Sequence, residues 1–202
     1  MLRGGVKASS SPAFVGPTRP LCHRAAASKP TMSDPSFPFH DEAIALVKAP
    51  VDRVFAHLDN PKALSAHMGK SSMRMMGSHM SMDVDADGGH AIGSRIRMRG
   101  SVMGVPISLE EVVTERRAPH KKLWETIGSP RLLVIARYRM GFELRRKGDS
   151  TLVRVFIDYG LPTTVPGLWL GRLLGSVYAR WCTKQMVDDA ARHFDSTVVQ
   201  GA

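Results

Sequence analysis

Glu111 is the residue whose type and position could most directly do chemistry. Alternation along residues 105–117 places it on one face with four apolar side chains: Val105, Ile107, Leu109 and Val113. A carboxyl group among apolar side chains must find a partner or raise its pKa, and a raised pKa is how a general acid or base is made. Two interpretations without chemistry stay open: a bulge near Pro106 that shifts the register, or a place for Glu111 at the wet mouth of a cavity.

Tyr138 and Tyr159 also fall on the apolar faces of predicted strands. Each combines an apolar ring with a hydroxyl that needs a hydrogen-bond partner. They could orient a carbonyl or phenol group of a ligand, or they could be core tyrosines whose hydroxyls are satisfied within the protein. Trp124 could join them, although its strand alternates poorly and leaves its face ambiguous. The candidate catalytic residues are therefore Glu111, Tyr138 and Tyr159.

The other residue types that carry chemistry form no recognisable site. The eight histidines are scattered, without the HExxH or paired spacing of metal ligands, and the two cysteines form no cluster. No GxSxG motif occurs, and Gly88-Gly89 is typical of a turn and not of a phosphate-binding loop. We therefore predict no metal site and no cofactor, and we expect Cys182 to be a small buried apolar side chain.

The net charge of +10 is divided between two parts of the chain. Five of the 28 basic residues lie in residues 1–33, which hold no acid. The rest of the chain therefore has 23 basic and 18 acidic residues, a net charge of +5. This is not the charge pattern of a nucleic-acid-binding surface, and no nucleic-acid partner is expected. No stretch of 18 apolar residues occurs, which argues against a transmembrane span.

The N-terminal residues 1–36 are rich in Ser, Ala, Pro and Gly and show no periodicity. We predict a disordered basic tail or a targeting segment there, followed by one domain over residues 37–202. A transit peptide in residues 1–33 would imply an organelle, and otherwise we expect a cytoplasmic protein. Pro12, Pro17 and Pro20 interrupt any amphipathic helix in this tail, and Met32 would make a natural start for the folded part.

The elements that must position the candidate residues follow from the hydrophobic pattern. A strand is expected at 42–48, followed by short helices at 51–59 and 62–69. Six strands then follow between turn signals, at 74–85, 93–103, 105–117, 122–128, 132–146 and 151–159. Short turns between consecutive strands imply antiparallel pairing, and the alternation gives the sheet one apolar and one charged face.

The charged face carries a row of arginines: Arg95, Arg97, Arg99, Arg137, Arg139 and Arg154. Such a row could bind an anionic lipid or a nucleic acid. Acidic residues on the same register, Glu110, Glu143 and Asp158, offer partners on neighbouring strands. We therefore expect the arginines to form cross-strand ion pairs.

A long C-terminal helix follows the last strand, because the chain runs without a breaker for about thirty residues after Pro166. Small residues stand at every fourth place in its first half: Gly167, Gly171, Gly175 and Ala179. Each glycine inside a helix costs roughly 1 kcal/mol relative to alanine, so this stripe indicates a need for empty space or for close approach. A long helix with such a face, laid on a sheet, is one way to leave a cavity.

The larger apolar residues of this helix form two stripes that point in different directions. The first half carries Leu170, Leu174, Val177, Tyr178 and Trp181, and the second half carries Val187, Ala190, Ala191 and Phe194 almost opposite. One straight helix cannot place both stripes on one sheet. Either the helix kinks near Thr183, or its halves contact different things. The first half would then be a cavity lid, a dimer contact or a peripheral membrane contact through residues 166–181.

Two segments resemble the START-like superfamily, also called SRPBCC, which includes polyketide cyclases/dehydrases and pollen-allergen-type ligand carriers. These are IALVKAPVDRVFAHLDNPKALSAHM and GLWLGRLLGSVYARWCTKQMVDDAARHF, and the resemblance covers about residues 42–195. It implies an α+β helix-grip fold: a curved seven-stranded antiparallel sheet wrapped on a long C-terminal helix, with two short helices after the first strand. The resemblance is specific for fold and not for activity.

The resemblance implies a cavity between the sheet and the C-terminal helix that holds a hydrophobic or aromatic small molecule, lipid- or polyketide-like. Methionines on the apolar register would suit such a guest, or would simply fill an adaptable core. The predicted lining is Met76, Met80, Met98, Leu109, Glu111, Tyr138, Met140, Tyr159, Gly171, Leu174, Gly175 and Tyr178. Two alternatives are a cyclase- or dehydratase-type enzyme that uses general acid/base catalysis, and a quinone- or ribosome-associated interaction module. The oligomeric state stays open.

Overall fold

The computed structural model describes residues 36–61, 79–102 and 104–198, together with Met1. After the first strand, β1 (Phe39–Val47), comes the short helix α1 (Val51–Asp59). The remaining strands are β2 (His79–Val84), β3 (Arg95–Val102), β4 (Val105–Arg117), β5 (Lys121–Arg131), β6 (Tyr138–Lys147) and β7 (Ser150–Tyr159). The helix α3 (Val165–Val198) ends the described chain. The second short helix, predicted at 62–69, lies outside the described residues.

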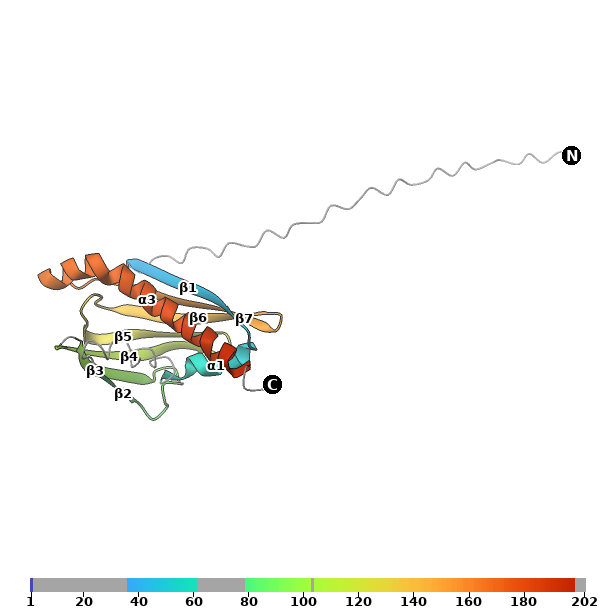
Figure 1. The fold of residues 1–202 in the computed structure, drawn as a ribbon, viewed down its shortest axis with the longest axis horizontal. Coiled ribbons are helices and arrows are strands. Elements are labelled where there is room, and N and C mark those ends of the chain that lie inside the picture. The colour runs from blue at the N-terminus through green and yellow to red at the C-terminus, as the bar shows by residue number, and fades with distance from the viewer. Residues whose placement is uncertain (2–35, 62–78, 103, 199–202) are drawn as a thin grey trace. The chain divides into compact units, whose positions relative to one another are not determined.

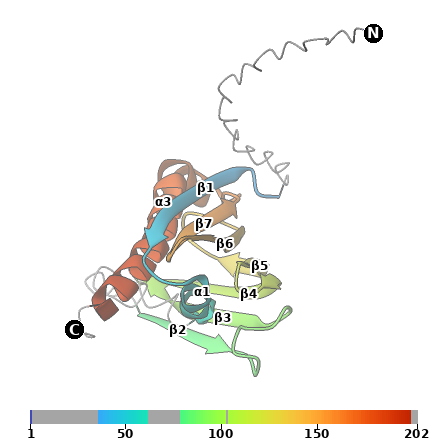
Figure 2. The ribbon, with the colours of Figure 1, turned by 90° about the vertical axis from the view of Figure 1, so that its right-hand side faces the viewer.

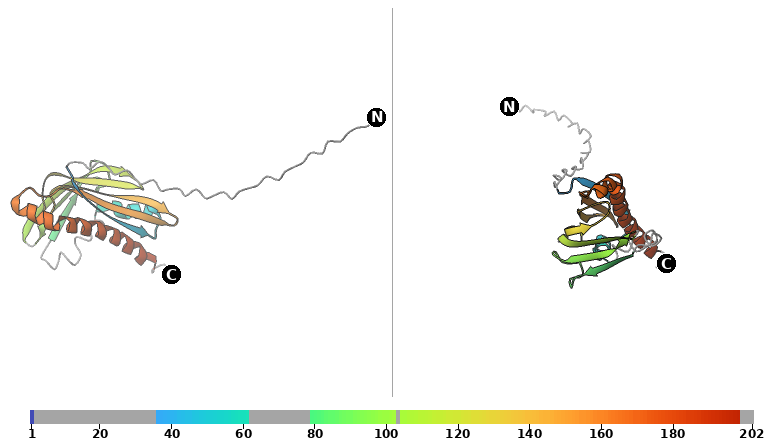
Figure 3. Two further views of the ribbon diagram at one scale, coloured as in Figure 1. Left: turned by 90° about the horizontal axis from the view of Figure 1, so that it is seen from above. Right: turned by 90° about the vertical axis from the view of Figure 1, so that its left-hand side faces the viewer.

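The strands form one seven-stranded antiparallel sheet in the order β1-β7-β6-β5-β4-β3-β2. Consecutive strands from β2 to β7 are neighbours, as short turns require, and β1 closes the row by pairing with β7. The helix α3 crosses one face of the sheet (Figure 1). The short helix α1 packs at the edge of the sheet where the C-terminal end of β1 lies (Figures 1 and 2). All the strands gather on one side of α3 (Figure 3). This is the predicted α+β helix-grip architecture.

The core lies between the sheet and the two helices. Along β6 and β7 every second side chain is buried, because a strand turns alternate residues to opposite faces. The buried set from these strands is Tyr138, Met140, Phe142, Leu144, Val153, Val155, Ile157 and Tyr159, and it packs against Val54, Phe55 and Leu58 of α1 and Met186, Val187, Ala190 and Phe194 of α3. The apolar stripe of the second half of α3 therefore faces the core, while Arg192 on its other side is exposed.

The strands β5 and β6 differ from their predicted bounds. The sequence predicted a turn at Ser129-Pro130 and a strand from 132, but β5 continues to Arg131 and β6 begins at Tyr138. The reason is a β-bulge: Gly128 has φ +68, and the register against β4 shifts between Ser108 and Glu110. Residues 132–137 form a connection instead, which is tied to the end of β7 by hydrogen bonds from Ala136 N to Gly160 O (2.8 Å) and from Gly160 N to Arg137 O (2.8 Å).

The glycine stripe of α3 serves close approach and not empty space. A Cβ on Gly171 would lie 2.9 Å from the carbonyl oxygen of Val134 and 3.0 Å from Cδ of Pro162. A Cβ on Gly175 would lie 3.1 Å from Cδ2 of Leu161. The first half of the helix therefore rests directly on the connection before β6 and on the chain that leaves β7.

The small residues also explain how one helix can carry two apolar stripes that point in different directions. The buried face of α3 runs through Gly171, Gly175, Ala179 and Thr183 and continues into Met186, Val187, Ala190 and Phe194. Steps of four residues advance this face by about 40° each, so it winds slowly into the second stripe. α3 is a single helix from Val165 to Val198. The two halves do contact different things, because the leucines of the first half do not face the sheet.

The outer face of the sheet carries the expected ion pairs. Arg97 Nε lies 3.3 Å from Glu110 Oε1 across β3 and β4, and Arg154 NH1 lies 3.2 Å from Glu143 Oε2 across β6 and β7. Because these pairs lie at a solvated face, they neutralise charge more than they stabilise the fold.

Candidate functional site

Glu111 lies on the inner face of β4, between Ile96 of β3 and Thr126 of β5. Only 4% of its surface is exposed. The pairing of β4 with β5 shifts between Ser108 and Glu110 and between Val113 and Glu115. Neither shift includes Glu111, so its side chain keeps the inward orientation. The predicted inward orientation is therefore confirmed, and Glu111 does not sit at an exposed mouth.

Neighbouring strands supply two hydrogen bonds to this carboxyl. The Tyr138 hydroxyl, from β6, donates to Glu111 Oε1, and the indole N–H of Trp124, from β5, donates to the same side chain. The backbone of Tyr138 is fixed by the buried Thr126: its N–H donates to Thr126 Oγ1 (3.1 Å), and that hydroxyl donates to Tyr138 O (3.3 Å). Three strands thus hold one carboxyl in place.

Burial raises the pKa of Glu111 to about 7. The hydrogen bonds from Tyr138 and Trp124, and the charge of Lys122, lower that pKa but offset only part of the burial. A carboxyl with a pKa near neutrality can both give and accept a proton under physiological conditions. The sequence pattern predicted this raised pKa for a carboxyl on an apolar face.

The helix α3 covers this carboxyl with Tyr178 and Cys182, which are hydrogen-bonded to each other. Glu111 is close enough to raise the pKa of the Tyr178 hydroxyl, after the larger effects of Cys182 and of burial. Burial raises the pKa of the Cys182 thiol to about 12, so it stays a neutral thiol and not a nucleophilic thiolate. The Glu111 cluster comprises Glu111, Trp124, Tyr138, Tyr178 and Cys182.

Tyr159 is not part of the Glu111 cluster, although it pairs with Tyr138 across β6 and β7. Its ring stacks on Phe39 at 5.5 Å between centroids. Burial raises the pKa of its hydroxyl, with a further contribution from Asp41. Of the three candidate catalytic residues, the structure brings Glu111 and Tyr138 together and leaves Tyr159 in separate surroundings.

The other predicted lining residues are spread over the fold. Met98 and Met140 are buried on the inner face and Leu109 is half-buried, whereas Gly171 and Gly175 touch the chain at 134 and 161 and Leu174 is 39% exposed. Met80 lies in β2 opposite Gly100, and Met76 lies outside the described residues.

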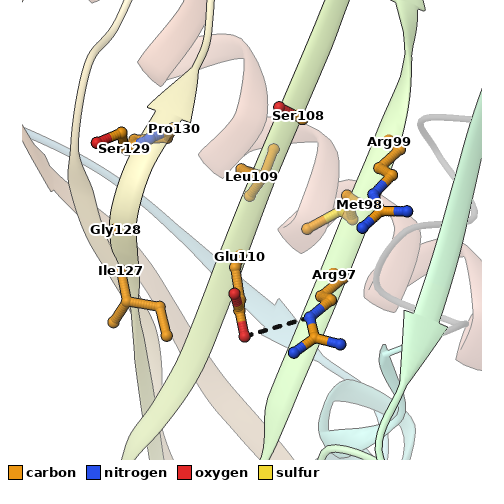
Figure 4. A pocket seen from close by; sticks show the side chains of 10 residues that line it. All are labelled: Arg97, Met98, Arg99, Ser108, Leu109, Glu110, Ile127, Gly128, Ser129 and Pro130. Carbon is orange, nitrogen blue, oxygen red and sulfur yellow. Dashed lines mark ion pairs between the residues drawn. The ribbon is translucent and has the colours of Figure 1, made fainter.

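A hollow of about 210 Å³ lies on the opposite, outer face of the sheet. Figure 4 shows it between Arg97 and Arg99 of β3, Glu110 of β4 and the bulged segment 128–130 of β5, with an ion pair between Arg97 and Glu110. The hollow lies where the register between β4 and β5 shifts, between Ser108 and Glu110. Glu111 is not among the residues that line it.

Sequence reasoning missed a second buried cluster, around Lys122 and Asp59. Lys122 is 2% exposed, and its Nζ donates to Asp59 Oδ1 (2.7 Å) and to Gly89 O (2.8 Å). Arg116 NH2 donates to Asp59 Oδ2 (2.8 Å). Burial alone would raise the pKa of Asp59, but the hydrogen bonds from Arg116 and Lys122 hold it below its usual value.

This second cluster joins the end of α1 to β4, β5 and the turn before β3. A signal for it exists in the sequence: Lys122 shares the inner register of β5 with Trp124 and Thr126, and a lysine on an apolar face needs an acidic partner.

The described residues, 36–61, 79–102 and 104–198, contain no group of three or more His, Cys, Asp or Glu side chains that could hold a metal ion. Within the same ranges, no helix is long and apolar enough to cross a membrane.

The fold matches solved structures, whereas no family model and no curated protein sequence matches the chain. The protein TTHA0849 from Thermus thermophilus is 16% identical with a TM-score of 0.59, over 78% of this chain and 98% of that one. Truncated norcoclaurine synthase from Thalictrum flavum is 16% identical with a TM-score of 0.55, over 76% and 91%. The chain shares the helix-grip fold of these structures.

A third structure with the helix-grip fold, Ara h 8.0201, is 8% identical with a TM-score of 0.50, over 75% of this chain and 97% of that one. The predicted START-like resemblance is thus confirmed as a fold. Identities this low show the fold alone, so the activity must be argued from the residues inside it.

Proposed function

We propose that the protein binds an apolar or aromatic small molecule that carries a hydrogen-bonding oxygen, and that the Glu111 cluster holds this oxygen. The observation that carries the proposal is a buried carboxyl with a pKa of about 7, hydrogen-bonded to Tyr138 and Trp124 on the inner face of the sheet. Burying a carboxyl costs free energy that an apolar residue of the same size would not cost. A ligand that uses the group gives a reason for its presence.

The chemistry of the cluster suits such a ligand. When protonated, Glu111 donates a hydrogen bond to a carbonyl oxygen, and when ionised it accepts one from a hydroxyl or phenol. Met98, Met140 and the Trp124 ring supply apolar contact surface beside it. The ligand class is therefore hydrophobic in its body and polar at one end, as in a lipid, an aromatic phenol or a polyketide-like molecule.

We propose that a ligand enters the cluster past the side chains of α3 that cover it. Tyr178 and Cys182 lie over Glu111, and Leu174, one turn earlier, is 39% exposed. We expect the ligand to displace these side chains from the carboxyl, while the sheet below stays fixed by the Thr126 bonds to Tyr138. Side-chain movement of this kind is common where binding sites form on a rigid scaffold.

Native mass spectrometry of the purified full chain tests the proposal. We expect wild-type protein to carry a noncovalent small molecule that organic extraction removes, and Glu111→Met to carry less of it. Tyr159→Phe serves as the matched control, because its hydroxyl lies outside the cluster, and it should match wild type. Absence of any bound molecule in wild type, or equal retention by Glu111→Met, would contradict the proposal.

A second candidate function is an enzyme of the cyclase or dehydratase kind, favoured by the pKa of about 7 at Glu111. In it, Glu111 would exchange a proton with the bound substrate and Tyr138 would stabilise the charge on the ionised carboxylate. Glu111→Gln should then abolish turnover of a polyketide-like substrate while it preserves binding. Turnover that is unchanged in Glu111→Gln would exclude this candidate.

A further inference from the structure

The first half of α3 exposes a stripe of large apolar side chains. Trp169 is 73% exposed, Leu173 73% and Val177 63%, and the spacing of four residues places them along one side of the helix. Figure 1 shows that the beginning of α3 projects beyond the ends of the strands. Leu170 and Leu174, beside the stripe, are 38% and 39% exposed. We call these five residues the α3 stripe.

The α3 stripe is exposed because the opposite side of the helix is the one that packs. A Cβ on Gly171 would lie 2.9 Å from the carbonyl oxygen of Val134, and a Cβ on Gly175 would lie 3.1 Å from the side chain of Leu161, so this side of the helix is in close contact with the chain beneath it. The helix therefore turns its leucines and tryptophan away from the protein. A contiguous apolar surface of this kind marks contact with another molecule or with a membrane.

The charge around the α3 stripe is positive. Residues 159–187 contain Arg172, Arg180 and Lys184 and no Asp or Glu, and residues 128–137 contain Arg131 and Arg137 and no acid. These two segments touch, since a Cβ on Gly171 would lie 2.9 Å from Val134 O. Arg180 lies 3.7 Å from Asp41 and Lys184 pairs with Asp188 at 2.8 Å, whereas Arg131, Arg137 and Arg172 are exposed at this end of the molecule.

We propose that this end of the protein docks on a membrane surface that contains anionic phospholipid. In this arrangement Trp169, Leu173 and Val177 enter the boundary between headgroups and acyl chains, where tryptophan is favoured. Arg131, Arg137 and Arg172 contact the lipid phosphates. A second copy of the chain is a poorer occupant, because a symmetric contact would bring the same arginines of both copies together. The proposal goes beyond ligand binding and does not depend on it.

Co-sedimentation of the full-length protein with vesicles tests the docking. One vesicle preparation contains equal parts of phosphatidylglycerol and phosphatidylcholine, and the other contains phosphatidylcholine alone. We expect binding to the anionic vesicles that weakens at high salt. The double substitution Trp169→Ser/Leu173→Ser should weaken it at least about 10-fold, and Arg172→Gln about 5-fold, which is the usual effect of one basic residue at an anionic surface.

Matched controls come from other parts of the surface. Leu46→Ser removes an apolar side chain of β1 that is 51% exposed, and Arg145→Gln removes an exposed arginine near the β6–β7 turn, at the opposite end of the sheet from the start of α3. Both controls should bind the anionic vesicles as wild type does.

Three results would overturn the proposal. The first is the absence of sedimentation with anionic vesicles. The second is equal binding by wild type, Trp169→Ser/Leu173→Ser and Arg172→Gln, which would place the contact in the basic residues 1–33 that every variant retains. The third is a dimer in light scattering that the double substitution dissociates, without vesicle binding, which would make the α3 stripe an interface between two copies.

Discussion

The Glu111 carboxyl changes its protonation across the neutral range, because burial raises its pKa to about 7 while an exposed glutamate titrates near 4.5. At neutral pH roughly half of the molecules therefore carry a neutral Glu111. Both forms have partners: the ionised form accepts bonds from Tyr138 and Trp124, and the neutral form adds a donor. At the residue scale, this one group links stability, pH and ligand chemistry.

The stability of the protein should fall with rising pH through this group. Between the unfolded value of 4.5 and the folded value of about 7, the native state binds more protons than the unfolded state, so the contribution is largest at low pH and is lost as the pH rises. Between about pH 5 and about pH 8, we expect the free energy of unfolding to decrease by roughly 2 to 3 kcal/mol because of Glu111. Glu111→Gln should lack this decrease in urea unfolding at the two pH values, and an unchanged decrease would contradict the assigned pKa.

The Tyr138 hydroxyl should hold the pKa of Glu111 down, because it donates to the ionised carboxylate. In Tyr138→Phe we expect that pKa to rise further, as followed by NMR of the labelled glutamate carboxyl carbon. Tyr159→Phe is the control, since its hydroxyl lies near Asp41 and not near Glu111. A rise of equal size in both variants would show that the hydroxyl bond is not the cause.

Single residues could be predicted where strand alternation alone decides the face. That was enough to turn Glu111 and Tyr138 inward. It did not reveal that Trp124 bonds the carboxyl, because its strand alternates poorly. Nor did it reveal Lys122 with Asp59, which are 63 positions apart and meet only when α1 packs against the sheet.

At the scale of elements, the close contact of α3 with the chain beneath it makes a distinct prediction. Gly171→Ala should destabilise the protein by about 1 to 3 kcal/mol, although alanine favours a helix, because the new Cβ would meet the Val134 carbonyl oxygen. Ser176→Ala, at an exposed position of the same helix, should be neutral or slightly stabilising. Thermal unfolding of both variants measures this, and a stabilised Gly171→Ala would mean that space is left under the helix.

The buried pair of Lys122 and Asp59 should matter more than any surface pair of the sheet. Lys122→Met fills most of the volume but leaves Asp59 with one fewer cation, and we expect a loss of about 2 to 4 kcal/mol in urea unfolding. The neighbouring Lys121 faces outward and pairs with Glu115 at 3.0 Å. Lys121→Met should therefore cost less than about 1 kcal/mol. Equal losses from the two substitutions would contradict the assigned roles.

The elements themselves were largely predictable, because turn signals divide the chain and alternation marks each strand. Two features were not. Because of the bulge at Gly128, β5 continues past Ser129-Pro130, a pair whose sequence is typical of a turn. The next strand therefore begins later than predicted. The orientation of α3 depends on which side packs closest, and only the contact of Gly171 with Val134 decides that.

At the scale of the whole molecule, the helix α3 separates two kinds of chemistry. Its inner side closes over Glu111 with Tyr178 and Cys182, and its outer side exposes Trp169 and Leu173. The sequence resemblance supplied the fold, but this division follows from the packing of the helix.

The most direct test of the account compares two probes that differ by one hydroxyl, naphthol and naphthalene. Their affinities are measured for the full chain by displacement of anilinonaphthalene sulfonate fluorescence. We predict that wild type and Tyr159→Phe prefer naphthol by about 5- to 10-fold, the usual effect of one hydrogen bond in a buried site, and that Glu111→Met loses this preference. Binding of neither probe, or the same preference in Glu111→Met, would contradict the assignment of Glu111 as the group that holds the ligand.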